Sequence, residues 1–345
     1  MARGADASAA IVAWPSAKLR PDCDVINAVR SIITWSVKIV VSGGLLYWLL
    51  SKIDRAELWN RLHTAMPAWV ALALVLYLVV ILISAWRWQR LLDAQHVPVS
   101  FAHLTASYLV ATFFNNFLPS NIGGDVIRIR DTAKAAGSKT RAATIVLFDR
   151  AIGLVGLVFV AALGATIATG LGDREPFNPT WLWLGLAAGA VGIMAGLFFP
   201  GVIAAVLAPL RVFHQEWVEL RITRLIHALE KFAQAPTALV QCFTGSVVVQ
   251  GVIVVFYAAL AHAMHIPVPA VHLAVLIPMS FVVQMLPLSV NGFGVRESIF
   301  AYYFARLGLP RESAIALSFL GAALIMLFSV SGAVVMAARK KPAHS

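Results

Sequence analysis

Charged residues are scarce in this sequence of 345 residues: they make up 12% of it, against 60% hydrophobic residues. Soluble domains are about a quarter charged, so an ordinary soluble fold is excluded. No long polar block separates the hydrophobic runs, and a helix that crosses a membrane needs roughly 20 residues. The sequence therefore predicts an all-α, polytopic integral membrane protein with no room for a separate catalytic domain.

Patterns for catalysis and cofactor binding are missing as well. Cys23 and Cys242 lie far apart, without the spacing of a disulfide framework, a redox motif or a metal site. No nucleotide-binding motif occurs, and no Ser/His/Asp or Cys/His pattern accompanies the charged residues. His262, His265 and His272 flank one short loop, but interfacial histidines are more often structural than metal-binding. We expect no metal, no cofactor and no direct coupling to ATP.

The formal net charge of +11 does not indicate a nucleic-acid-binding protein. The basic residues lie between the hydrophobic runs, where the positive-inside rule and anionic lipid headgroups account for them. No basic stripe with interleaved aromatic residues is present. Membrane lipid is therefore the expected partner, and nucleic acid is not.

Eight hydrophobic runs follow the polar residues 1–30. They cover 32–50, 68–86, 101–118, 142–170, 181–210, 237–263, 271–290 and 313–338. Two of them differ from ordinary crossings, because 101–118 is studded with polar residues and 271–290 is interrupted by Pro278 and Pro287. Lipid cannot replace the backbone hydrogen bonds that proline removes, so such segments have to be covered by protein or line a polar cavity.

Lys and Arg gather in alternate connecting segments, which sets the expected orientation. They are frequent before residue 31 and in 87–100, 119–141, 211–236 and 339–341, and scarce in 171–180 and 264–270. The consistent solution has six crossings, with 101–118 re-entrant from the cytoplasmic side and 271–290 re-entrant from the outside. The transmembrane domain is then 31–340, and 1–30 and 341–345 are cytoplasmic tails.

This arrangement implies an inverted repeat. Residues 68–170 and 237–338 form two units of similar layout whose hairpins enter from opposite sides. The hairpin tips, "LPSNIGGDVIR" at 118–128 and "LPLSVNGFGVRE" at 286–297, share Leu-Pro, an Asn, two glycines and an Arg when one gap is allowed. Secondary transporters use such repeats to build a site near the membrane midplane. The alternative is that two Gly-rich turns resemble each other by chance.

Two further segments are expected at the membrane surface. "WRWQRLL" at 86–92 is interpreted as an aromatic and basic anchor at the interface. Residues 211–236 are expected to form an amphipathic helix on the inner surface. Its apolar side chains near one face are Phe213, Trp217, Leu220, Leu225, Leu229 and Phe232.

Charged residues inside hydrophobic runs are costly, so they mark polar cavities or partners. Asp149 and Arg150 lie well inside 142–170 and point about 100° apart on a helix, so each needs another partner. Asp125 and Arg128 are three residues apart and share a helical face. Asp125 and Arg128 follow the pair Gly123-Gly124. In the second hairpin, Arg296 and Glu297 follow Gly292 and Gly294.

We predict that these groups hold an anionic headgroup such as phosphate. Arg128, Arg150 and Arg296 would bind it together with free backbone N–H groups at the hairpin breaks, and the neighbouring acids would balance their charge or take up protons. The predicted binding residues are Asn115, Asn116, Gly123, Gly124, Asp125, Arg128, Asp149, Arg150, Asn291, Gly292, Gly294, Arg296 and Glu297. The alternative is that these pairs are salt bridges that fasten the hairpins to neighbouring helices.

Four motifs in order, "RWQRLL", "NNFLPSNIGGDVIR", "FDRAIGL" and "LPLSVNGFGVRE", resemble the lysylphosphatidylglycerol synthase transmembrane region family, also known as flippase-like or UPF0104 proteins. The resemblance covers about residues 30–340 and implies the same site residues except Asn116, together with Pro119. In full-length relatives this region is similar to the part that moves aminoacylated phospholipid between leaflets, and a separate cytosolic domain attaches the amino acid. These 345 residues hold no such synthase domain, so the resemblance implies lipid translocation without lysyl transfer.

The leading hypothesis is a multi-pass lipid translocator of the bacterial inner membrane. Its cargo would be a phospholipid, a hopanoid or a glycolipid, since stand-alone relatives are associated with hopanoid or glycolipid pathways. Two alternatives stay open. One is a membrane-embedded transferase in aminoacyl-phospholipid, hopanoid or polyprenyl-phosphate glycolipid synthesis, and the other is an accessory partner of a lipid-modifying enzyme.

Overall fold

The computed structural model describes residues 63–117, 123–173, 175–199, 215–285 and 292–339, together with the single residues 47, 59, 201 and 205. All regular secondary structure in these ranges is helical. Five of the described helices are long and apolar enough to cross a membrane: α3 (Pro67–Ala94), α6 (Lys139–Gly170), α7 (Pro179–Phe198), α10 (Pro236–Ala263) and α13 (Arg311–Ala338). The predicted all-α, polytopic membrane class is confirmed. The expected crossing at 32–50 and the terminal tails 1–30 and 341–345 lie outside the described residues.

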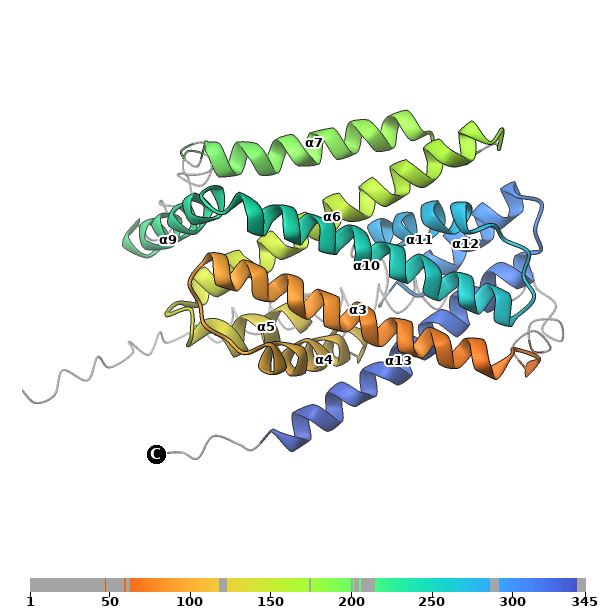
Figure 1. Cartoon of the computed structure of the whole chain (residues 1–345), viewed down its shortest axis with the longest axis horizontal. Coiled ribbons are helices and arrows are strands. Elements are labelled where there is room, and N and C mark those ends of the chain that lie inside the picture. The colour runs from red at the N-terminus through yellow and green to blue at the C-terminus, as the bar shows by residue number, and fades with distance from the viewer. Residues whose placement is uncertain are drawn as a thin grey trace, which may run out of the picture.

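Two pairs of shorter helices take the places of the expected re-entrant segments (Figure 1). The first pair is α4 (Phe101–Phe117) with α5 (Gly123–Ala133), and the second is α11 (Ala270–Gln284) with α12 (Val295–Arg306). At 1.5 Å per residue, the 17 residues of α4 measure about 26 Å, which is less than the roughly 30 Å of a bilayer core. The expected break at Pro278 is wrong, because Pro278 lies within α11 and the helix continues to Gln284.

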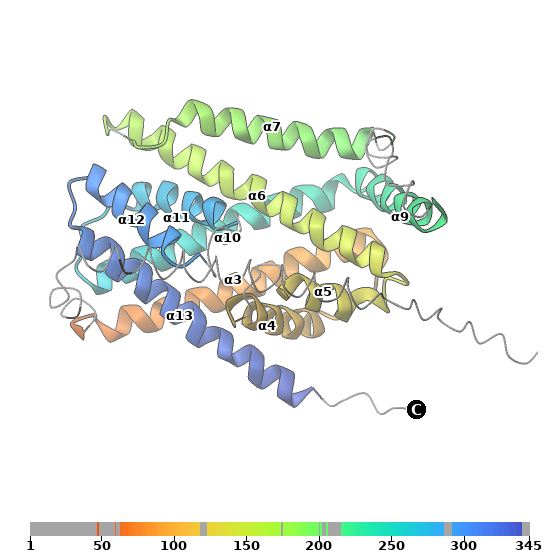
Figure 2. The ribbon, with the colours of Figure 1, turned by 180° about the vertical axis from the view of Figure 1, so that it is seen from behind.

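The two hairpins enter the bundle from opposite ends. The end that carries α9 (Gln215–Ala233) also carries the close of α3, where the Gln95 side chain donates to the carbonyl of Ala228 at 2.8 Å. The segment between α5 and α6 lies there too, because Arg224 of α9 donates to the Ser138 hydroxyl at 3.1 Å. The outer end of α5 is joined to the close of α13, where Arg339 donates to Asp131 at 2.6 Å. Figures 1 and 2 both place α4 and α5 towards this end and α11 and α12 towards the other.

At the α9 end, the Asp131 carboxylate pairs with two guanidinium groups, those of Arg130 and Arg339. Burial alone would raise the pKa of its carboxyl, but hydrogen bonds from Arg339 and Arg130 outweigh burial and hold that pKa below its usual value. At the opposite end, Glu175 in the α6–α7 loop accepts from Tyr303 of α12 at 2.6 Å and contacts the His272 ring of α11 at 2.6 Å. Each hairpin is therefore fastened by a carboxylate at its own end.

The helices of the second half repeat those of the first half in the same order along the chain. The series α3, α4, α5, α6 has lengths of 28, 17, 11 and 32 residues, and the series α10, α11, α12, α13 has 28, 15, 12 and 28 residues. The two first helices, α3 and α10, pack along each other, whereas α4 packs on α13 and α11 packs on α6. Each hairpin therefore rests on the last helix of the other half.

Glycine permits these exchanged contacts. A Cβ atom at Gly332 of α13 would overlap the backbone carbonyl of Leu109 in α4, and one at Gly164 of α6 would press on Ala274 of α11. Small residues of this kind let helix backbones approach closely where lipid supplies no hydrophobic driving force.

The remaining helices, α7 and α9, lie at the periphery. Helix α7 packs along α6 at the edge of the bundle, and most of its side chains are exposed. Helix α9 buries Val218, Ile222, Leu229 and Phe232, which are spaced as one helical face. Leu220 does not share this buried face, because its side chain is exposed. Phe213 and the side chain of Trp217 lie outside the described residues.

Gly332→Ala is expected to destabilise the protein by about 1–3 kcal/mol, because overpacking has to push α4 away from α13. The measurement is the thermal melting temperature in detergent. Gly192→Ala in α7 is the matched control, since a Cβ atom there meets nothing within 4 Å. Equal melting temperatures for the two variants would contradict the close contact at Gly332.

Candidate functional site

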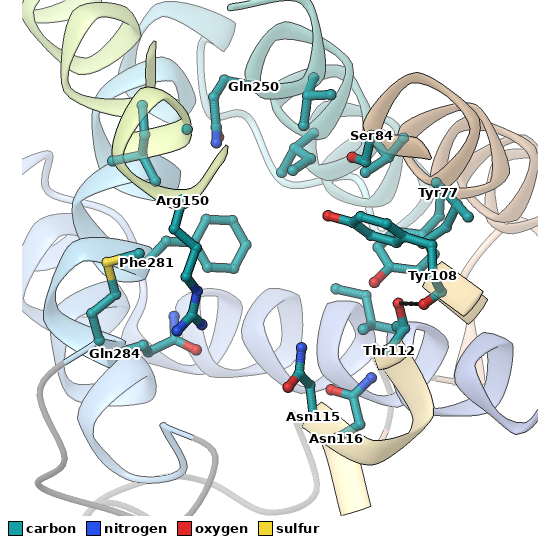
Figure 3. Close-up of a pocket in the computed structure, with 18 of the residues that line it drawn as sticks. Tyr77, Ser84, Tyr108, Thr112, Asn115, Asn116, Arg150, Gln250, Phe281 and Gln284 are labelled. Carbon is teal, nitrogen blue, oxygen red and sulfur yellow. Dashed lines mark hydrogen bonds between the residues drawn. The ribbon is translucent and has the colours of Figure 1, made fainter. Parts of the chain in front are cut away.

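A cavity of about 380 Å³ opens where the two hairpins meet the crossing helices α3, α6, α10 and α13. Its polar wall combines guanidinium, amide and hydroxyl groups from Tyr77, Ser84, Arg87, Tyr108, Thr112, Asn115, Asn116, Arg150, Gln250, Gln284 and Arg296. Figure 3 shows the labelled members of this set surrounding one common space. The apolar core is divided into two clusters, one on either side along the bundle, and the cavity lies between them.

Asp149 joins three helices beside this cavity. Its side chain is 1% exposed, and its two oxygens pair with Arg87 Nε of α3 and Arg128 Nη2 of α5, each at 2.7 Å. Arg87 also donates to the Ser246 hydroxyl of α10 at 2.7 Å. A buried acid that loses its partners is strongly destabilising, so these contacts hold the first hairpin against α3 and α6.

The ion pairs continue from Arg128 towards the cavity. Arg128 Nη1 lies 3.7 Å from Asp125 Oδ1, and Arg150 Nη1 lies 2.9 Å from Asp125 Oδ2. The guanidinium of Arg128 also lies over the Trp88 ring, 4.3 Å from its centroid. The chain of alternating charges thus runs from a fully buried carboxylate to Arg150, whose side chain is 36% exposed and lines the cavity.

The second hairpin has a shorter version of the same arrangement. Arg296 Nη2 pairs with Glu297 Oε1 at 2.7 Å, and the Ser318 hydroxyl of α13 donates to that same carboxylate oxygen at 2.8 Å. The other oxygen of Glu297 accepts the N–H of Gly294 at 2.7 Å, which closes the start of α12. Arg296 is thereby held against the cavity wall.

An amide side chain packs on a glycine in both hairpins. In the first, Gly124 N–H donates to Asn115 Oδ1 at 2.8 Å, and a Cβ atom at Gly124 would overlap that amide. In the second, a Cβ atom at Gly292, whose φ is +76°, would overlap the Gln284 side chain. Glycine is needed at both positions because the second leg of the hairpin approaches the last turn of the first leg.

The structure brings most of the predicted site residues together, but in two layers. Asn115, Asn116, Arg150 and Arg296 line the cavity. The residues that support this layer from behind, or shape the hairpins, are Gly124, Asp125, Arg128, Asp149, Gly292, Gly294 and Glu297. Gly123 begins α5. Asn291 and Pro119 lie outside the described residues.

Arg87 is the main residue that the sequence analysis placed wrongly. Helix α3 continues to Ala94, so Arg87 and Trp88 lie inside the bundle, are buried and are not part of a surface anchor, whereas Arg90 of the same motif is partly exposed. The available signal was helical spacing: Arg87 and Leu91 are four residues apart and share one face. Gln250 and Tyr108 were missed because single polar residues inside apolar runs carry no pattern.

His262 and His272 contact different groups. His262 packs edge-on against Trp69, with 4.4 Å between the ring centroids, whereas His272 contacts Glu175. Among the residues that the structure describes, no group of three or more His, Cys, Asp or Glu side chains is arranged to hold a metal ion.

Parts of this chain are similar to two known membrane proteins. A UPF0104 membrane protein of Pyrococcus horikoshii is 28% identical over 92 residues, which is 26% of this chain and 28% of that protein. A UPF0104 membrane protein of Methanothermobacter thermautotrophicus is 27% identical over 166 residues, which is 47% of this chain and 48% of that protein. The match thus spans less than half the length of either relative.

The family model for the lysylphosphatidylglycerol synthase TM region matches residues 35–332, which include both hairpins and all the helices that line the cavity except the last turns of α13. The chain is therefore a multi-pass membrane protein that belongs to the lysylphosphatidylglycerol synthase TM region family.

Proposed function

We propose that this protein moves a lipid between the two leaflets of a membrane, with the headgroup passing through the cavity between the hairpins. The observation that carries the proposal is that one cavity is lined by hairpins from opposite ends of the bundle and contains Arg87, Arg150 and Arg296. Inverted repeats with discontinuous helices are the architecture in which a central site is reached alternately from each side.

The depth of the cavity suits this role. Gln250 lies 14 residues after the start of α10 at Pro236 and 13 before its end at Ala263, or about 20 Å from either end at 1.5 Å per residue. Polar groups at this depth are expensive unless they pair with one another or face a polar cavity, and such groups often mark substrate pathways. Val80, Leu154 and Val249 supply an apolar part of the wall, against which the lipid tail can pass.

The basic residues suggest which end faces the cytoplasm. The end with α9 carries Arg90, Arg130, Lys134, Lys139, Arg141, Arg221, Arg224, Lys231 and Arg339. Arg306 and Arg311 lie at the other end, and they weaken this asymmetry without reversing it. By the positive-inside rule, we place the α9 end, with both termini, in the cytoplasm, and the protein in a bacterial inner membrane. The candidate cargo is a phospholipid, hopanoid or glycolipid, and a lipid-modifying enzyme is a candidate partner.

Arg150→Ala is expected to abolish lipid exchange, because it removes the cation at the cavity end of the charge chain. The measurement is exchange of labelled lipids between leaflets in proteoliposomes, compared with empty vesicles. Arg130→Ala on α5 is the control, since the Arg130 side chain is 65% exposed and away from the cavity. Full exchange by Arg150→Ala would mean that the ion pair between Arg150 and Asp125 is only structural. The proposed function itself would be overturned if the wild-type protein exchanged lipids of several classes no faster than empty vesicles do.

Asp149→Asn is expected to lower stability by about 3–5 kcal/mol, because it leaves two buried guanidinium groups without a full counter-charge. The readout is the melting temperature of the purified protein in detergent. Asp93→Asn, the same substitution at a side chain that is 48% exposed, is expected to change stability by less than about 1 kcal/mol. A similar small effect for both variants would contradict the structural role of Asp149.

A further inference from the structure

A second cavity, separate from the one between the hairpins, lies at the α9 end of the bundle. Its volume is about 410 Å³, and its walls are α6, α9 and one residue of α5. Figures 1 and 2 both place α9 beside the first turns of α6, and the two helices are in contact. No residue lines both cavities. We name this second cavity the α6–α9 groove.

The α6 wall of the groove runs from a cation to an exposed leucine. Lys139, Ala143 and Leu147 follow one another at intervals of four residues, so they share one face of the helix. Leu147 lies about 12 Å from Lys139 along the helix axis, and its side chain is 62% exposed.

The length of α6 places these residues at different depths in a bilayer. The 32 residues of α6 measure about 48 Å, and the hydrocarbon core is roughly 30 Å thick. A helix centred on that core extends about 9 Å beyond it at each end. Lys139 therefore lies among the headgroups, and Leu147 lies at the edge of the hydrocarbon.

The α9 wall supplies a second cation and more apolar surface. Arg221 lines the groove together with Val218, Ile222 and Leu225, which lie three and four residues apart on one face of α9. Glu219 is two residues from Arg221, so it points to another side of the helix, and it is exposed. No Asp or Glu is among the described residues that line the groove.

An occupant of this groove needs both an apolar part and an anionic part. A free anion would pair with Lys139 and Arg221 but would leave the apolar wall uncovered. A lipid without net charge would cover the apolar wall but would bring no counter-charge. Basic side chains at the membrane surface attract anionic headgroups, and amphipathic helices there bind anionic lipid through apolar area and charge together.

We infer that the α6–α9 groove binds a resident phospholipid with an anionic headgroup, from the leaflet at the α9 end. Its phosphate lies between Lys139 and Arg221, and one acyl chain runs along Ala143, Leu147 and Leu225. This lipid fastens α9 to the bundle and is not the cargo of the cavity between the hairpins. The inference thus goes beyond the proposed function.

The test measures the melting temperature of the delipidated protein in detergent after addition of three probes. Phosphatidylglycerol is expected to raise it by at least about 3 °C, and phosphatidylcholine and inorganic phosphate by less than about 1 °C. An equal rise with phosphatidylcholine would overturn the role of the anionic headgroup. An equal rise with inorganic phosphate would show that the occupant is a free anion and would overturn the lipid.

The double variant Lys139→Glu, Arg221→Glu reverses both cations of the groove and is expected to lose the rise with phosphatidylglycerol. The matched control is Lys134→Glu, Lys231→Glu, which makes the same charge change at the same end of the bundle but outside the groove. This control is expected to keep the rise. Equal rises in the two double variants would contradict binding in the groove.

Arg150→Ala separates the groove from the cavity between the hairpins, because Arg150 lines only that cavity. This variant is expected to keep the rise with phosphatidylglycerol. Loss of the rise would place the lipid in the cavity between the hairpins and would overturn the inference. Since the readout is binding, a wild-type protein that exchanges no lipid would remove the proposed function and leave this inference standing.

Ala143→Phe fills the groove without changing its charge, so it provides a second variant if the charge reversals prevent folding. Without added lipid, its melting temperature is expected to equal or exceed that of the wild type, because the new ring covers apolar wall. The rise with phosphatidylglycerol is expected to disappear. A rise as large as in the wild type would show that no acyl chain occupies the groove.

Discussion

The fold depends on how one carboxylate is neutralised away from water. Asp149 lies in the interior of α6, and its two oxygens accept guanidinium groups from α3 and α5. Separating any member of this set would leave an ion in an apolar interior at a cost of several kcal/mol. Helix α5 is therefore held at a defined height beside α6. That height places Asp125 next to Arg150 and so determines which cation reaches the cavity.

The two halves have the same order of helices, but the polar interactions that hold their hairpins differ. In both, an amide at the end of the first leg packs on a glycine of the second leg, which covers backbone that lipid could not satisfy. The first half then adds a chain of charges that spans three helices, whereas the second keeps only Arg296, Glu297 and a serine hydroxyl. The first hairpin is thus bound to its neighbours through this interior chain as well as through Asp131 at its outer end, and the second through the Ser318 hydroxyl and through Glu175 at its outer end.

Much of this architecture could be predicted from sequence, because hydropathy and loop charge act through the bilayer and are local in the chain. They predicted the five crossing helices that the structure describes, the two hairpins and the helical pairing of Asp125 with Arg128. They failed at Arg87, because the end of an apolar run was taken as the end of a helix that in fact continues to Ala94. They also failed at Gln250 and Tyr108, because the packing of distant helices alone brings these residues to the cavity.

The exchange of hairpins between the halves has a mechanical consequence. Helix α4 is seated on α13 and α11 is seated on α6, and backbone contacts at Gly332 and Gly164 leave little room for sliding. A tilt of either crossing helix must carry with it the hairpin that belongs to the other half. For the proposed lipid translocation, this coupling means that the two halves of the bundle move together and not separately.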